Sequence, residues 1–193
     1  MMSNEASKQY EEKIFAYLFD KDALYTKMEN FARNLAKKQG HEFHSAKFTC
    51  IETMILKEGL YFMGQRMDCP IEKDSNVYEN ARKHFTTDYI YIEGIAMREN
   101  YQTPVLHAWL VNKKTGAIFD PTWGNEGLAY AGVAFSKPFV DHTINDWQSN
   151  AIFDEESDNT THMLFAGLSS DAFYKRAIPE TVECTLLAMA HLG

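Results

Sequence analysis

Two residues, His107 and Asp120, have the side-chain types of a general base and of the acid that orients it. They lie on either side of a short turn predicted to join two antiparallel strands, and we assume that Asn112 pairs with Ala117 across it. Trp109 then lies opposite Asp120, and His107 lies diagonally from Asp120 on the same face of the sheet. Such diagonal neighbours are about 7–8 Å apart, within side-chain reach. We therefore expect an imidazole nitrogen and a carboxylate oxygen within about 3.2 Å of each other.

A pair of this kind needs a nucleophile, and a helix start is a favourable place for one because the helix dipole stabilises a thiolate. Ser75 or Asn76 is predicted to cap a helix that runs to about Phe85, directly before the strands. The nearest cysteine, Cys69, lies in a predicted loop ahead of this helix, and Cys50 lies in an apolar segment typical of a core. The three cysteines (Cys184 is the third) show no disulfide framework.

Five short motifs follow one another in the middle of the chain: Val77-Tyr78-Glu79-Asn80-Ala81, Tyr91-Ile92-Glu93-Gly94, His107-Ala108-Trp109, Asp120-Pro121-Thr122-Trp123-Gly124 and Tyr130-Ala131-Gly132-Val133-Ala134-Phe135. Their order resembles that of the transglutaminase-like and papain-like cysteine enzymes. It also resembles a group of small bacterial and phage proteins of that superfamily, in which a Cys precedes a Tyr-x-Asn-Ala helix. The resemblance covers about a third of the chain, from Asn76 to Phe135.

This resemblance implies an α+β, papain/transglutaminase-like fold, in which a helix packs on a small antiparallel sheet with helices before and after it. It implies that His107 is the general base and Asp120 its orienting partner. The nucleophile position falls on Val77, which has no atom that can attack a substrate. We therefore expect a catalytically inactive protein, or pseudoenzyme, that binds a protein or peptide partner through the former substrate cleft. No cofactor and no metal are expected.

Three other interpretations stay open at this point. The protein is an active cysteine hydrolase or acyltransferase on amide bonds, using Cys69 or Cys50 with His107 and Asp120. Alternatively, His107 is a core histidine whose ring is satisfied by Asp120, without any catalytic history. In the third, the protein is a binding module whose helical regions, rather than a cleft, contact the partner.

The hydrophobic periodicity predicts a single domain over residues 1–193, with a helical part (1–64), a motif-bearing core (75–136) and a second helical part (137–193). Two helices are expected within residues 4–40, and residues 45–64 are ambiguous, with helix favoured. Strands are expected at about 88–93, 103–111, 117–120 and 128–135. Further helices are expected at about 139–148, 160–173 and 179–191, with Cys184 on the apolar side of the last one.

Several single residues also allow predictions. Glu93 shares a strand face with Tyr89 and Tyr91, which favours a buried carboxylate over an exposed one, without an assigned role. Trp109 and Trp123 are expected to pack beneath the His107 and Asp120 segments. The run His41-Glu42-Phe43-His44 lacks the spacing of a zinc-binding helix and is read as a solvated turn.

Composition excludes some classes of function. The 193 residues carry 27 acidic and 19 basic side chains, a net charge of −8, and the basic ones form only short clusters. Nucleic-acid binding is not expected, since it requires clustered Lys and Arg. No apolar run approaches the roughly 20 residues that span a bilayer, and the first residues lack the pattern of a signal peptide. We therefore expect a cytoplasmic protein that binds no membrane.

Overall fold

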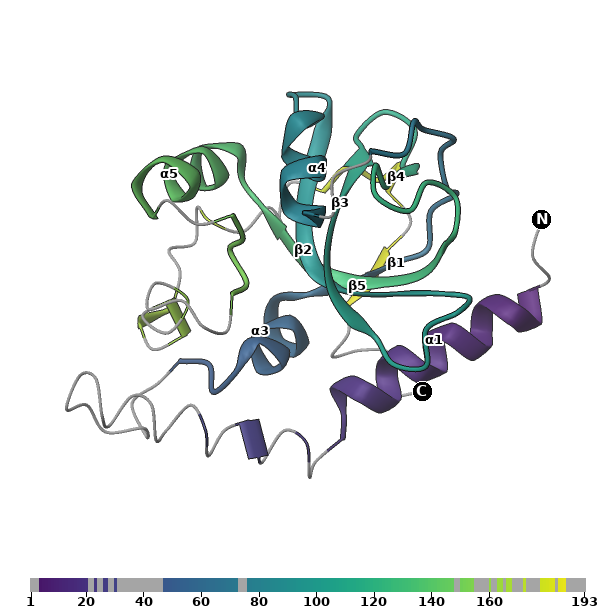
Figure 1. The fold of residues 1–193 in the computed structure, drawn as a ribbon, viewed down its shortest axis with the longest axis horizontal. Helices are drawn as coiled ribbons and strands as arrows, with labels where there is room; N and C mark the ends of the chain where they lie inside the picture. The colour runs from purple at the N-terminus through teal and green to yellow at the C-terminus, as the bar shows by residue number, and fades with distance from the viewer. Residues whose placement is uncertain are drawn as a thin grey trace.

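The computed structural model describes residues 4–20, 23, 26–27, 30, 47–72, 76–147, 150–154, 160, 163–164, 166–167, 172, 178–182 and 184–186. Its centre is a six-stranded antiparallel sheet with strand order β4-β3-β2-β5-β1-β6 (Figure 1). The strands are β1 (Leu60–Phe62), β2 (Tyr89–Arg98), β3 (Val105–Asn112), β4 (Ile118–Phe119), β5 (Gly127–Phe135) and β6 (Cys184–Leu186). The helices are α1 (Asn4–Leu18), α3 (Ile51–Glu58), α4 (Val77–Lys83) and α5 (Lys137–Trp147). The predicted α+β class is confirmed.

The sheet is buried on both faces. Side chains alternate between faces along a strand, so Tyr91 and Leu110 lie on one face and Ile92 and Trp109 on the other. The first face packs against all four of these helices, through residues such as Ile14, Met54, Ala81 and Val140. The second face carries His107 and is covered by loop residues, among them Trp123 and Val182. The chemistry expected from the sequence therefore lies on the face opposite the main helical layer.

The hairpin that carries His107 has the predicted register. Leu110 pairs with Phe119 and Val111 with Ile118, and the Asn112 amide donates to the Ala117 carbonyl at 2.9 Å. Gly116, at φ +70°, permits the turn, because this left-handed conformation is strained for residues with a Cβ. Asp120 therefore leaves β4 opposite Trp109, as predicted.

Two segments differ from their predictions. Residues 45–64 contain helix α3, as favoured, but Gly59 ends it and the unpredicted strand β1 follows. The predicted helix at 179–191 is wrong, because Cys184 lies in strand β6, which pairs with β1. The apolar spacing there resembled a helix, but the unpaired edge of β1 offers backbone hydrogen bonds that only the folded sheet provides.

The other helix predictions are confirmed where they can be compared. Helix α1 lies within the first predicted segment, α4 begins after Asn76, and α5 matches the helix expected at 139–148. Most of the second N-terminal helix, the run His41–His44 and most of the helix at 160–173 fall outside the described residues.

Candidate functional site

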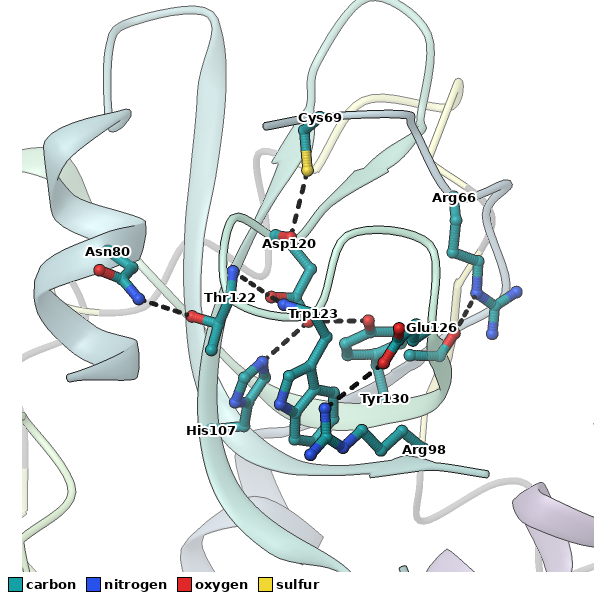
Figure 2. Close-up of polar contacts among 11 residues, drawn as sticks. Arg66, Cys69, Asn80, Arg98, His107, Asp120, Thr122, Trp123, Glu126 and Tyr130 are labelled. Carbon is teal, nitrogen blue, oxygen red and sulfur yellow. Dashed lines mark hydrogen bonds and ion pairs between the residues drawn. The ribbon is translucent and has the colours of Figure 1, made fainter. Parts of the chain in front are cut away.

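The centre of the site is the hydrogen bond between His107 and Asp120. Nε2 of His107 lies 2.8 Å from Oδ2 of Asp120, and both side chains are fully buried (Figure 2). The predicted contact between them is confirmed. Because an ionised carboxylate only accepts, the arrangement fits a ring whose Nε2 carries a proton and points Nδ1 away from Asp120.

Asp120 is held by three further donors. Its Oδ2 also accepts from the Tyr130 hydroxyl at 2.9 Å, and its Oδ1 accepts from the backbone amides of Thr122 and Trp123 at 3.0 Å each (Figure 2). Burial alone would raise the pKa of Asp120, but the His107 ring and these donors hold that pKa below its ordinary value. The site therefore favours an ionised carboxylate whose orientation is determined by four hydrogen bonds.

The loop after β4 positions the Asp120 carboxylate through hydrogen bonds within residues 120–124. An aspartate that accepts from the amides two and three residues ahead closes a tight turn, and Asp120 does so through Oδ1, which leaves Oδ2 for His107 and Tyr130. Gly124 donates its amide to the Asp120 carbonyl at 2.7 Å and adopts φ +62°. The sequence Asp-Pro-Thr-Trp-Gly thus folds back beside the strand that carries His107.

Aromatic rings cover the imidazole. The Trp123 ring lies flat on His107, with centroids 3.8 Å apart and planes 15° from parallel. Trp109 lies farther along the same face, its centroid 6.4 Å from that of His107. Gly132 makes room for it, because a Cβ there would come within 2.7 Å of the indole. The predicted packing role of both tryptophans is confirmed.

The remaining ring nitrogen of His107 has no partner. Among the described residues, Nδ1 of His107 and Nε1 of Trp109 are buried polar atoms without a hydrogen bond. Leaving such an atom unsatisfied costs about 1–3 kcal/mol. Nδ1 is also the atom that a neighbouring thiol or hydroxyl would contact if His107 acted as its base.

Helix α4 packs on the first face of the sheet and reaches the Asp120 loop through Asn80. Asn76 caps the helix by accepting from the amides of Tyr78 and Glu79, which makes Val77 its first residue. One turn later Asn80 donates to the Thr122 hydroxyl at 3.1 Å, and the Thr122 amide in turn binds Asp120 (Figure 2).

Val77 and Asn80 are three residues apart and therefore share a helix face. Val77 occupies the first turn of a helix packed against β3, as predicted, and is half-buried. A direct contact between Val77 and the His107 ring stays a prediction.

Both candidate thiols bond elsewhere. Residues 63–72 run along β4, where the Met67 amide donates to Ile118, and Cys69 donates its thiol to the Asp120 carbonyl at 3.1 Å. Burial, followed by the nearby Asp120 charge, raises the pKa of Cys69. Cys50 caps α3, and burial raises its pKa to about 11. Within the described residues no sulfur is hydrogen-bonded to the His107 ring, as predicted.

Glu93 is buried, as favoured, but on the opposite face from His107. Its carboxylate accepts from the Tyr91 hydroxyl at 2.7 Å and from the backbone amides of Ile152 and Phe153 at 2.8–3.0 Å. Burial raises its pKa to about 7, although these donors and Arg82 act in the other direction. The hydrogen bonds of Glu93 therefore connect the segment after α5 to the sheet, and Glu93 does not contribute to the His107 site.

Sequence reasoning missed three residues that complete the site: Tyr130, Thr122 and Arg98. Tyr130 and Thr122 bind Asp120, and the Arg98 guanidinium lies over the Trp123 ring, 5.5 Å from its centroid. Tyr130 and Thr122 stood within the recognised motifs, but nothing local in the sequence pairs Tyr130 with Asp120, which lies ten residues earlier.

In the described part of the chain no group of three His, Cys, Asp or Glu side chains could hold a metal ion, and no described helix has the length and apolarity to cross a membrane. No protein-family model, curated protein or solved structure matches this chain.

Proposed function

We propose that this protein is a non-catalytic relative of the papain/transglutaminase-like cysteine enzymes that holds a peptide or protein segment beside the His107 site. The proposal rests on one observation: Nδ1 of His107 is buried and has no hydrogen-bond partner among the described residues. Its Nε2 binds a well-ordered carboxylate, as in a base prepared for proton transfer, while its Nδ1 has no partner among the described residues. An active enzyme would place its nucleophile at that nitrogen.

Position 77 is the place that we propose for the missing partner. The helix that reaches the Asp120 loop through Asn80 begins with Val77, and a valine offers neither a proton nor a nucleophile. The alternative, an active hydrolase or acyltransferase using Cys69 or Cys50, is disfavoured. The pKa of both thiols is raised, which lowers the fraction of reactive thiolate at neutral pH.

The binding half of the proposal rests on the surface around the Asp120 loop. His107 and Trp123 are themselves 0% and 5% exposed, so a partner meets the residues that surround them first. Ile71 is 57% exposed and lies against Gly124, next to Trp123. An exposed isoleucine beside the buried aromatic cluster of the His107 site is a suitable contact for an apolar peptide side chain.

The absence of a reactive nucleophile is tested by thiol labelling in four proteins: wild type, Val77→Cys, Val77→Cys with His107→Ala, and Lys83→Cys. Lys83 lies in the same helix and is exposed, so its cysteine reports an ordinary thiol. If His107 lowers the pKa of a cysteine at position 77 to about 6, its thiolate fraction at pH 7 rises roughly 30-fold over that of an ordinary thiol. Labelling with iodoacetamide is followed at each cysteine by peptide mass mapping.

We expect fast labelling at position 77 only while His107 is present. Rapid labelling of Cys69 or Cys50 in wild type and in Val77→Cys, lost in Val77→Cys with His107→Ala, would instead establish an active enzyme. A cysteine at position 77 that reacts no faster than the one at position 83 would remove the case for a lost nucleophile.

Peptide binding is tested separately by selecting binders from a random peptide library on the wild-type protein. Ile71→Asp should weaken the selected peptides at least tenfold, because it places a charge beside the site. Met63→Asp is the control, since Met63 is also an exposed residue of segment 63–72, directly after β1. Peptides that tolerate Ile71→Asp and not Met63→Asp would place the binding surface elsewhere.

A further inference from the structure

Trp123 is one of the side chains that bury His107. The Trp123 ring lies on the imidazole, and His107 has no exposed surface. Outside Trp123 lies Arg98, whose guanidinium is 5.5 Å from the Trp123 ring centroid and 4.7 Å from that of Tyr101. Tyr101 also contacts Trp123 edge-on at 5.4 Å. The order from solvent inward is therefore Arg98, then Trp123, then His107.

The outermost member of this stack is held by an exposed ion pair. Nη1 of Arg98 lies 3.4 Å from Oε2 of Glu126, and Glu126 comes from the same loop as Trp123 (Figure 2). The Glu126 side chain is 60% exposed and that of Arg98 33%, so water and salt reach both charges. An ion pair of this kind is weak and easily broken. Arg98 thus connects the end of β2 to the loop that carries the cover of the site.

Burial of His107 leaves one of its ring nitrogens without a hydrogen bond, which costs free energy. His107 Nδ1 is buried without a partner, and water could reach it only if side chains that bury the imidazole, such as Trp123, moved away. Stacking on His107 and the contacts with Arg98 and Tyr101 oppose this movement. The balance between closed and open states depends on the difference between these opposing contributions.

We infer that Trp123 is a lid over His107 and that Arg98 is its latch. The lid opens by rotation of the Trp123 side chain, while the Asp120 turn keeps its backbone hydrogen bonds, and the open state exposes Nδ1 of His107. The inference goes beyond the proposed function and does not depend on it, because it concerns access to His107 whether or not position 77 once held a nucleophile.

The test measures access to His107 directly. Diethyl pyrocarbonate modifies unprotonated imidazole nitrogens, and peptide mass mapping gives the rate at each histidine. In Arg98→Gln, which removes the ion pair with Glu126 and the cation above Trp123, we expect His107 to react roughly 5- to 30-fold faster than in wild type. His84, which is part-exposed in the wild-type protein, serves as the internal reference and should keep its rate.

Lys137→Gln is the matched control. Lys137 also pairs with an exposed carboxylate, that of Asp141, and also lies over an aromatic ring, that of Phe85 at 5.0 Å. It should leave the His107 rate unchanged. Equal rates of His107 modification in Arg98→Gln and wild type would show that Arg98 does not hold Trp123 over His107.

A second measurement separates lid opening from general unfolding. The His107 rate is followed in urea well below the unfolding midpoint, where opening of one side chain exposes little surface and so depends weakly on urea. A rate in Arg98→Gln that rises with urea as steeply as global unfolding, or a similar acceleration in Lys137→Gln, would also overturn the inference.

Discussion

Glu93→Gln should remove a pH dependence of stability that arises from one buried carboxylate. Glu93 is 1% exposed, and burial raises its pKa from 4.5 to about 7 in the folded protein. Between these two values the folded chain holds a proton on Glu93 that the unfolded chain has lost. Stability from this group is therefore fully present below pH 4.5 and is lost as the pH rises through about 7.

The size of the effect follows from the same two values. A pKa change from 4.5 to about 7 corresponds to about 3 kcal/mol, because each pKa unit is worth about 1.4 kcal/mol. The free energy of unfolding of wild type, relative to Glu93→Gln, should fall by about this amount between pH 4.5 and pH 8. Glutamine also loses one acceptor oxygen for the amides of Ile152 and Phe153, but that loss does not vary with pH.

The assay is chemical denaturation of both proteins at intervals from pH 4.5 to 8. Subtracting the two curves cancels the titrating groups that the two proteins share, including Arg82 and Tyr91 beside position 93. Glu79→Gln is the control, since Glu79 is 46% exposed, and its difference from wild type should stay nearly flat. Parallel curves for wild type and Glu93→Gln would refute the reasoning, because they would mean that Glu93 ionises alike in the folded and unfolded chain.

Two further predictions concern the His107 site. Tyr130→Phe removes one donor to Asp120, which should lower stability by about 1.5–3 kcal/mol. Asp120 has a lowered pKa, so its stabilisation is lost on acidification, and in this variant the total loss should be smaller, because the pKa of Asp120 in the folded chain lies closer to its ordinary value. Denaturation between pH 2 and 6 measures both effects, and superimposable acid limbs would contradict the second. Gly132→Ala should cost about 1–3 kcal/mol in thermal unfolding, because its Cβ would approach the Trp109 ring and the Glu93 carbonyl within 2.7 Å. A variant as stable as wild type would show that Trp109 can shift freely.

The local parts of the site were predictable from the sequence. A turn with a preferred pairing sets the hairpin register, and the register alone brings His107 and Asp120 within reach of each other. Asn76 caps α4 through its own side chain, and period-two alternation indicated the burial of Glu93. Each of these depends on residues close together in the chain.

The failures involve partners far apart in the chain. The pairing of β6 with β1 joins segments more than a hundred residues apart, and no local signal at Cys184 indicates that edge. The bond from Tyr130 to Asp120 connects β5 to the loop after β4, although these strands are not neighbours in the sheet. Helical and strand spacings of a few apolar residues are also hard to tell apart without the partner.

The sequence by itself determined the chemistry that this chain carries: an imidazole and a carboxylate in one hairpin, a capped helix that begins with Val77, and no thiol at that helix start. Only the tertiary structure decided whether His107 meets solvent. Its burial depends on where the Trp123 and Arg98 side chains come to rest, and they belong to different segments, the Asp120 loop and β2. Stacking and burial are sums over neighbours brought together by the whole fold, so no single segment of the sequence specifies them.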